Sequence, residues 1–176
     1  RTLAAAIDIQ GAATQSSADW SPDGDWIAVG GLDAKGSGLF KIPRDGGPPV
    51  RLVAGRASNP IWSPDGTLIV YAGPPISGQV ALLGVRPDGG AVELPPVLVR
   101  GGAYRFLPNG TGLVYIPANQ SLDFWLLDLE KKITRRLTRL SDQGRLNTFD
   151  ITRDGTEIVF DRSRENSDIV LIDRPE

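Results

Sequence analysis

Side chains with an amide or carboxylate oxygen recur at nearly equal intervals along the 176-residue chain. They are Asp23, Asp65, Asn109 and Asp154, and the glycines that follow them are Gly24, Gly66, Gly110 and Gly155. Oxygen ligands brought together around one axis would suit a hard metal ion. Each of these residues, however, lies in a turn sequence such as Ser-Pro-Asp-Gly, where the Asp side chain bonds its own backbone and Gly adopts positive φ. We therefore interpret all eight as structural turn residues and predict no metal site.

The composition removes most of the usual catalytic groups. The chain has no Cys and no His, and therefore no thiolate nucleophile, no imidazole base and no Ser-His-Asp triad. A pair of catalytic carboxylates must converge within about 5–10 Å, whereas the repeated acids are expected one to a hairpin. The glycines of residues 30–38 lack the Lys-Ser/Thr and helix of a phosphate loop, and we interpret them as a flexible loop. The sequence predicts a chain that is not an enzyme and binds no cofactor.

The turns belong to a repeated unit of strand, tight turn and strand. The four copies begin their turns at Ser21, Ser63, Leu107 and Thr152, which gives spacings of 42, 44 and 45 residues. A period of about 40–45 residues with four strands in each repeat is typical of a β-propeller blade. The predicted fold class is all-β, a propeller of four-stranded antiparallel blades. Four blades are visible, as a four-bladed ring or as half of a larger one.

We predict a single propeller domain, or part of one, over residues 1–176. The blades are expected at about 18–53, 59–94, 103–138 and 147–173. Residues 130–140 also carry apolar side chains at helical spacing, but the repeat phase favours an outer strand there. This strand holds the one basic cluster of the chain, and its charges are typical of a solvated edge.

The two ends of the sequence are complementary in this scheme. The last blade has three strands, the third at residues 169–173, and residues 1–17 are in phase with a missing fourth strand. We expect residues 3–9 to pair with residues 169–172, because two unpaired edges would promote aggregation. The pairing can close one chain or join two chains as a homodimer.

Antiparallel strand order divides the connections between two ends of the propeller. The Asp-Gly turns share one end with other short turns, whereas the opposite end carries longer and more variable loops. Binding residues concentrate on loops that a rigid scaffold holds. We predict that basic residues on those loops bind a protein or peptide partner with acidic groups, namely Lys35, Arg56, Arg100, Arg139, Arg145, Arg162 and Arg164.

Charge and hydropathy exclude other partners. The net charge of −2 and the isoelectric point near 5.2 argue against a general nucleic-acid-binding protein. The longest uninterrupted apolar runs have five residues, so no membrane span is predicted. Because the chain begins at Arg1 and contains no Met, we expect it to be a module of a larger protein.

The sequences Trp20-Ser21-Pro22-Asp23-Gly24 and Trp62-Ser63-Pro64-Asp65-Gly66, with the apolar strands that follow them, resemble the WD-like repeats of TolB-type β-propellers. The resemblance covers residues 18–173, with four copies in register. Residues 149–171 are similar to the C-terminal ends of bacterial TolB-like sensor modules, which often follow a serine/threonine kinase or a winged-helix regulator. The resemblance implies a bacterial sensor or protein-interaction domain of a signalling protein, in the periplasm or elsewhere outside the cytoplasm. Such propellers usually have six or more blades, whereas four are visible here.

Two functional classes stay open. The favoured one is a non-catalytic binding or sensing module that uses loops on one face. The alternative is an accessory or gating propeller of a hydrolase or lyase. Propeller enzymes of that kind normally carry convergent His, Glu or metal ligands, whereas the glutamates of this chain are scattered, at Glu93, Glu130, Glu157, Glu165 and Glu176.

Overall fold

The computed structural model describes residues 7–8, 17–77, 79–118, 123–140 and 145–163, and these residues contain strands and turns but no helix. The strands are β1 (Ala18–Trp20), β2 (Trp26–Asp33), β3 (Gly36–Pro43), β4 (Val50–Ala54), β5 (Ser58–Trp62), β6 (Ile69–Ile76), β7 (Gln79–Val85), β8 (Ala91–Val92), β9 (Leu98–Phe106), β10 (Gly112–Pro117), β11 (Trp125–Asp128), β12 (Ile133–Arg136), β13 (Arg145–Ile151) and β14 (Ile158–Ser163). All their pairings are antiparallel, which confirms the all-β prediction.

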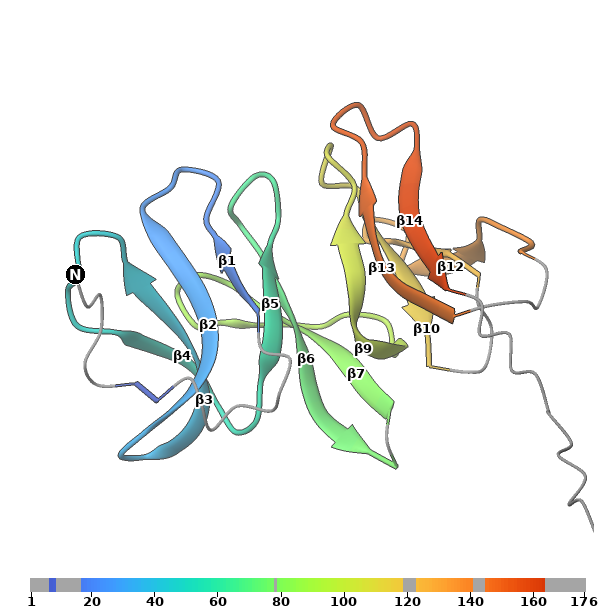
Figure 1. Ribbon diagram of the computed structural model, residues 1–176. Coiled ribbons are helices and arrows are strands. Elements are labelled where there is room, and N and C mark those ends of the chain that lie inside the picture. The colour runs from blue at the N-terminus through green and yellow to red at the C-terminus, as the bar shows by residue number, and fades with distance from the viewer. Residues whose placement is uncertain (1–6, 9–16, 78, 119–122, 141–144, 164–176) are drawn as a thin grey trace, which may run out of the picture.

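The strands form successive blades that lie along an arc (Figure 1). Blade 1 is the sheet β1-β2-β3-β4, and blade 2 consists of β5, β6, β7 and β8. Blade 3 contains β9, β10, β11 and β12, and the hairpin β13-β14 begins blade 4. The outer strand β12 confirms the choice of strand over helix in this region. The predicted third strand of blade 4 lies outside the described residues.

Strand β9 belongs to two blades. Its first residues pair with β7, through Val80↔Val99 and Ala81↔Leu98, whereas its last residues pair with β10. We predicted that blade 2 ends near residue 94, but residues 97–99 also pair with β7. Strand β8 ends at Val92, and Pro95 and Pro96, which follow it, have no N–H to donate to β7. Pairing resumes where the Leu82 N–H donates to the Val97 carbonyl, at 3.0 Å.

The glycine-rich stretch 30–38, predicted to be a flexible loop, is instead a paired hairpin. Its strands β2 and β3 stay in register to Asp33↔Gly36. The glycines serve close packing, because a Cβ atom on Gly30 would overlap the Ala57 carbonyl oxygen of the next blade. The predicted loop 73–79 is likewise largely paired, with β6 and β7 in register to Ile76↔Gln79.

The core lies between neighbouring blades. Strand β6 illustrates the arrangement, because Ile69 and Tyr71 pack in the cluster between blades 1 and 2, whereas Val70 and Ala72 pack in the cluster between blades 2 and 3. Ile69 and Val70 are fully buried. This strand is therefore covered on both faces, as its unbroken apolar sequence predicts.

The Asp-Gly turns also connect neighbouring blades at their tips. A proline of one turn lies against the glycine of the next, where an added Cβ would stand within ordinary contact distance of the proline ring. The distance from this added Cβ to the proline ring would be 3.7 Å for Gly66 and Pro22, 3.7 Å for Gly110 and Pro64, and a tighter 3.3 Å for Gly155 and Pro108. We call this series the proline–glycine ladder.

Two residues of the predicted N-terminal strand are described, and both contact blade 1. Asp8 forms a β-bridge with Leu32, with backbone hydrogen bonds of 2.8 and 3.0 Å. Ile7 packs on the buried cluster of Val29, Phe40 and Ile42. The other residues of the predicted closure lie outside the described part, so pairing with residues 169–172 stays a prediction. No helix in the described ranges is long and apolar enough to cross a membrane.

Candidate functional site

The first Asp-Gly turn shows what the repeated acids do. The Ser21 hydroxyl donates to Asp23 Oδ1 at 2.5 Å and accepts the Trp26 N–H at 2.9 Å. Asp23 also accepts the Asp25 N–H at 3.0 Å. Gly24 adopts a φ of 71°, which an L side chain rarely tolerates. The carboxylate thus completes the hydrogen bonding of its own turn.

The same arrangement recurs in blades 2 and 4. Asp65 accepts from the hydroxyls of Ser63 and Thr67, and Asp154 accepts from that of Thr152. Donation by these hydroxyls lowers the pKa of both carboxyl groups, as it does for Asp23. Blade 3 has Leu107 and Asn109 in the turn and therefore lacks the hydroxyl–carboxylate bond. Within the described ranges, no three acidic side chains lie close enough together to hold a metal ion.

Four of the seven predicted basic residues have described side chains, and all four are exposed. Lys35 lies in the β2–β3 turn, Arg56 between β4 and β5, Arg100 in β9 and Arg139 after β12. The β2–β3 and β4–β5 connections lie at the end of the molecule opposite the Asp-Gly turns of blades 1 and 2 (Figure 1). None of the four forms an ion pair in the part of the chain that the structure describes.

The remaining predicted residues are less fully placed. Arg145 begins β13 and Arg162 lies in β14, but their side chains are not described. Arg164 lies outside the described residues.

Two arginines that were not predicted to bind make the ion pairs at this end. Arg51 pairs with Asp33 and donates to the carbonyl oxygens of Gly36 at 2.7 Å and Ser37 at 2.8 Å. The hydrogen bond from Arg51 lowers the pKa of Asp33 and fixes the tip of the β2–β3 hairpin. Arg136 pairs with the buried carboxylate of Asp123. These ion pairs therefore do not involve the exposed residues Lys35, Arg56, Arg100 and Arg139, which stay accessible to a partner.

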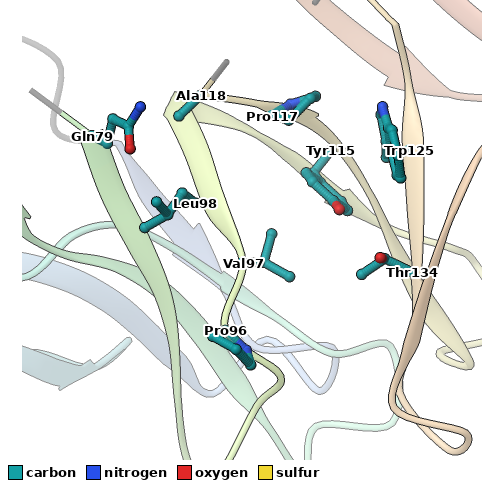
Figure 2. A pocket seen from close by; sticks show the side chains of 9 residues that line it. All are labelled: Gln79, Pro96, Val97, Leu98, Tyr115, Pro117, Ala118, Trp125 and Thr134. Carbon is teal, nitrogen blue, oxygen red and sulfur yellow. The ribbon is translucent and has the colours of Figure 1, made fainter.

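A groove of about 340 Å³ opens between blades 2 and 3 at the same end as the exposed cations. Figure 2 shows its lining, which comes from the outer part of blade 2 and from β10, β11 and β12 of blade 3. The lining residues are Gln79, Pro96, Val97, Leu98, Tyr115, Pro117, Ala118, Trp125 and Thr134. All are uncharged and most are apolar.

The deep part of the groove is continuous with the core between blades 2 and 3. Val97 and Tyr115 are 5% and 4% exposed and belong to that core cluster, so they form a fixed wall. Burial raises the pKa of the Tyr115 hydroxyl, and a hydrogen bond with Thr134 partly offsets this effect. The phenol therefore stays neutral at physiological pH. Leu98, on the outer lip, is 46% exposed.

Trp125 gives the groove an unused hydrogen-bond donor. Its Nε1 is buried, and among the described residues it meets no acceptor. In Figure 2 this nitrogen lies toward the end of the groove where Pro117 stands. A buried donor without a partner costs free energy. The mostly apolar lining of the groove suits an apolar group.

Sequence reasoning missed this groove and assigned Trp125 only to a third strand. Val97 and Trp125 come from different blades, and the intervening sequence contains no motif that would bring them together. The Pro95-Pro96 pair is the one local signal, because it interrupts the outer strand of blade 2 beside the groove. Arg100 was predicted, and it lies two residues beyond Leu98 on β9.

Comparisons with known proteins identify the fold. No family model matches the chain. The curated "Uncharacterized protein Atu1656" from Agrobacterium fabrum is 28% identical over 156 residues, which cover 81% of this chain and 53% of that protein. The structure of a putative TolB from Agrobacterium tumefaciens superposes with a TM-score of 0.62 and 24% identity, over 85% of this chain and 54% of that one.

Two further structures are similar at lower identity. TolB from Acinetobacter baumannii gives a TM-score of 0.66 and 18% identity, over 86% of this chain and 38% of that one. An oligogalacturonate lyase in complex with manganese gives 0.61 and 16%, over 85% and 47%. The chain thus spans about half the length of the curated relative and of the Agrobacterium structure. Together with the blades described above, these likenesses show that the chain has the all-β fold of a TolB-like β-propeller.

Proposed function

We propose that this propeller domain is a non-catalytic interaction module that binds a segment of a partner protein in the groove between blades 2 and 3. The observation that carries the proposal is the groove itself, a preformed and uncharged site. Its volume of about 340 Å³ is at the small end of known ligand sites, which span roughly 300–1,000 Å³. One or two side chains of an extended peptide would fill it.

The surroundings suggest which peptide fits. The lining is uncharged and mostly apolar, so the inserted side chain is apolar. The exposed Arg100 near the lip attracts acidic groups that flank the inserted residue. We therefore expect a peptide with a large apolar residue next to Asp or Glu. This agrees with the acidic partner that the basic loop residues predict.

A lyase activity is the alternative that the likeness to oligogalacturonate lyase raises. The chain has no His, and Asp23, Asp65 and Asp154 are bonded within separate turns, so these three acids form no convergent acid–base pair. We propose that it is catalytically silent. Oligogalacturonate, ester and peptide substrates, each tested with and without Mn²⁺, should show no turnover. Turnover that disappears on mutation of a single Asp or Glu would contradict this.

Peptide binding tests the groove directly. We suggest titrating the chain with acetylated tetrapeptides that combine one Phe, Leu or Trp with Asp or Glu residues, and following binding by calorimetry. Leu98→Glu should weaken the tightest peptide about tenfold or more, because it places a charge on an apolar contact. Val50→Glu is the matched control, because Val50 is similarly exposed (42%) but lies on β4, away from the groove. Equal losses in the two variants, or no binding of any peptide, would refute the proposed site.

A further inference from the structure

The outer strand of blade 3 is the edge of a sheet. Among the described residues, β12 pairs with β11 alone and stands last in the order β12-β11-β10-β9. Its residues pair with those of β11 without a register shift, and all of them are exposed. An edge strand of this kind presents backbone N–H and C=O groups to which a further strand can bind.

The hydrogen-bond pattern shows which residues present these groups. The Leu137 N–H donates to the Phe124 carbonyl oxygen at 2.8 Å, and the two residues stand opposite each other. Hydrogen-bonded and non-hydrogen-bonded pairs alternate along an antiparallel ladder. Arg135 therefore directs its backbone groups to β11, whereas Thr134 and Arg136 direct theirs away from the sheet. The outward groups have the alternate spacing that a paired strand requires.

The outer edges of blades 1 and 2 are interrupted. In blade 1, a register shift between Leu39 and Phe40 leaves a bulge in β4. In blade 2, β8 has two residues and is soon followed by Pro95 and Pro96, which have no N–H. Bulges, very short strands and prolines are common devices that prevent a further strand from pairing. Strand β12 contains neither a bulge nor a proline.

The edge of blade 3 is also basic. The segment from Glu130 to Leu140 has one acidic and five basic residues, in a chain whose net charge is −2. The basic residues are Lys131, Lys132, Arg135, Arg136 and Arg139. Lys132 and Arg135 form no ion pair within the described ranges. Like charges opposite each other destabilise a strand pair and opposite charges stabilise it, so this edge favours a strand with acidic side chains.

We propose that the partner segment binds β12 as an additional strand of blade 3. The inference rests on the proposed function, because the same segment fills the groove between blades 2 and 3. In Figure 2, the Thr134 side chain points from β12 toward this groove. Residues that stand opposite each other on neighbouring strands share a face of the sheet. The partner residue opposite Thr134 thus lies on the groove side.

Alternation along the added strand determines the sequence that fits. Successive side chains of a strand point to opposite faces. The partner residue that follows the one in the groove therefore lies beside Arg135, which is exposed on the other face. We expect an apolar residue at the first of these positions and Asp or Glu at the second. Backbone hydrogen bonds would supply affinity and the alternating side chains specificity, as in other cases of strand addition.

Backbone methylation of the peptide tests the binding mode. We suggest extending the tightest acetylated tetrapeptide to a hexapeptide and replacing each backbone N–H in turn with N-methyl. In an added strand, alternate N–H groups donate to β12. Binding measured by calorimetry should therefore weaken about tenfold at alternate positions and change little between them. Equal losses at every position, or no loss at any, would overturn the proposal.

Hydrogen exchange measured by NMR gives the matching result from the protein. The N–H groups of Thr134 and Arg136 should exchange freely without peptide and about tenfold more slowly when the peptide saturates the chain. The N–H groups of Arg135 and Leu137 are the controls, because both already face β11. Protection of Thr134 and Arg136 without peptide would show that this edge is already covered and would overturn the proposal.

A charge reversal tests the predicted acidic position. Arg135→Glu should weaken the tightest peptide about fivefold to tenfold, because it sets like charges opposite each other. Arg153→Glu is the matched control, because Arg153 is exposed but lies in the turn of blade 4. Circular dichroism checks that both variants fold. Equal losses in the two variants would contradict an acidic residue beside Arg135.

The groove and the added strand can fail separately. A peptide that Leu98→Glu weakens, but whose methylated series shows no alternation, would keep the groove site and refute the added strand. No binding of any peptide would refute both.

Discussion

A hydroxyl organises each of three Asp-Gly turns, and in blades 1 and 2 it belongs to a buried serine. Ser63 is 4% exposed, donates to Asp65 and accepts the Leu68 N–H at 2.9 Å. Removing this hydroxyl leaves a backbone donor without its acceptor and an acid without its hydrogen bond. The turn therefore depends on the Ser side chain as well as on the Asp and Gly residues that mark it in the sequence.

We predict that Ser63→Ala lowers the free energy of unfolding by about 1 kcal/mol at pH 7, a typical value for one lost hydrogen bond. The effect should depend on pH. The folded state lowers the pKa of Asp65 from 3.8, so this carboxylate stabilises the fold above that pH, and the stabilisation disappears as the pH falls through the folded pKa. In urea unfolding between pH 7 and pH 3, the free energy of unfolding should therefore fall less for Ser63→Ala than for the wild type.

Ser37→Ala is the control for this series, because Ser37 is exposed and uses only its backbone carbonyl in the bonds described. Its pH dependence should match that of the wild type. A Ser63→Ala variant whose pH dependence is also unchanged would show that the hydroxyl does not lower the pKa of Asp65.

At the scale of strands and hairpins, close packing explains most differences between prediction and structure. The turn units and their following strands were predictable, because Pro, Asp and Gly set local backbone conformation. We predicted Gly30 to be a loop residue. The sequence does not show that the Ala57 carbonyl oxygen lies where a Cβ of residue 30 would be. The groove could not be predicted for the same reason, because Val97 and Trp125 meet only after two blades have packed.

We predict that Gly30→Ala destabilises the chain by about 1–3 kcal/mol, the usual cost of overpacking. The added methyl group overlaps a backbone oxygen, which cannot move aside without displacing the link between blades 1 and 2. Gly90→Ala is the control, because the atoms nearest its added Cβ belong to the Arg86 and Asp88 side chains, which can rotate away. Thermal unfolding of both variants gives the comparison. Similar losses would mean that the close approach of the Ala57 carbonyl does not determine the cost.

At the scale of the whole molecule, the exposed cations and the Asp-Gly turns occupy opposite ends. We predict that the double variant Arg56→Glu, Arg100→Glu weakens binding of the acidic peptides about tenfold and reduces the salt dependence of their association rate. Arg44→Glu is the control, because Arg44 pairs with Asp25 at the opposite end. Stopped-flow fluorescence at two salt concentrations measures both effects. A control as damaging as the double variant would indicate attraction by overall charge without a defined binding end.

The proline–glycine ladder has a mechanical consequence for the groove. The Pro64 ring lies beside Gly110 at the turn tips of blades 2 and 3, so these tips would serve as the fulcrum of a rotation between the two blades. The groove opens between the same two blades away from the tips, where a small rotation would produce the widest opening. A bulky ligand that widens the groove would also displace the neighbouring prolines and glycines of the ladder. Occupancy of one groove would then change the curvature of the whole arc.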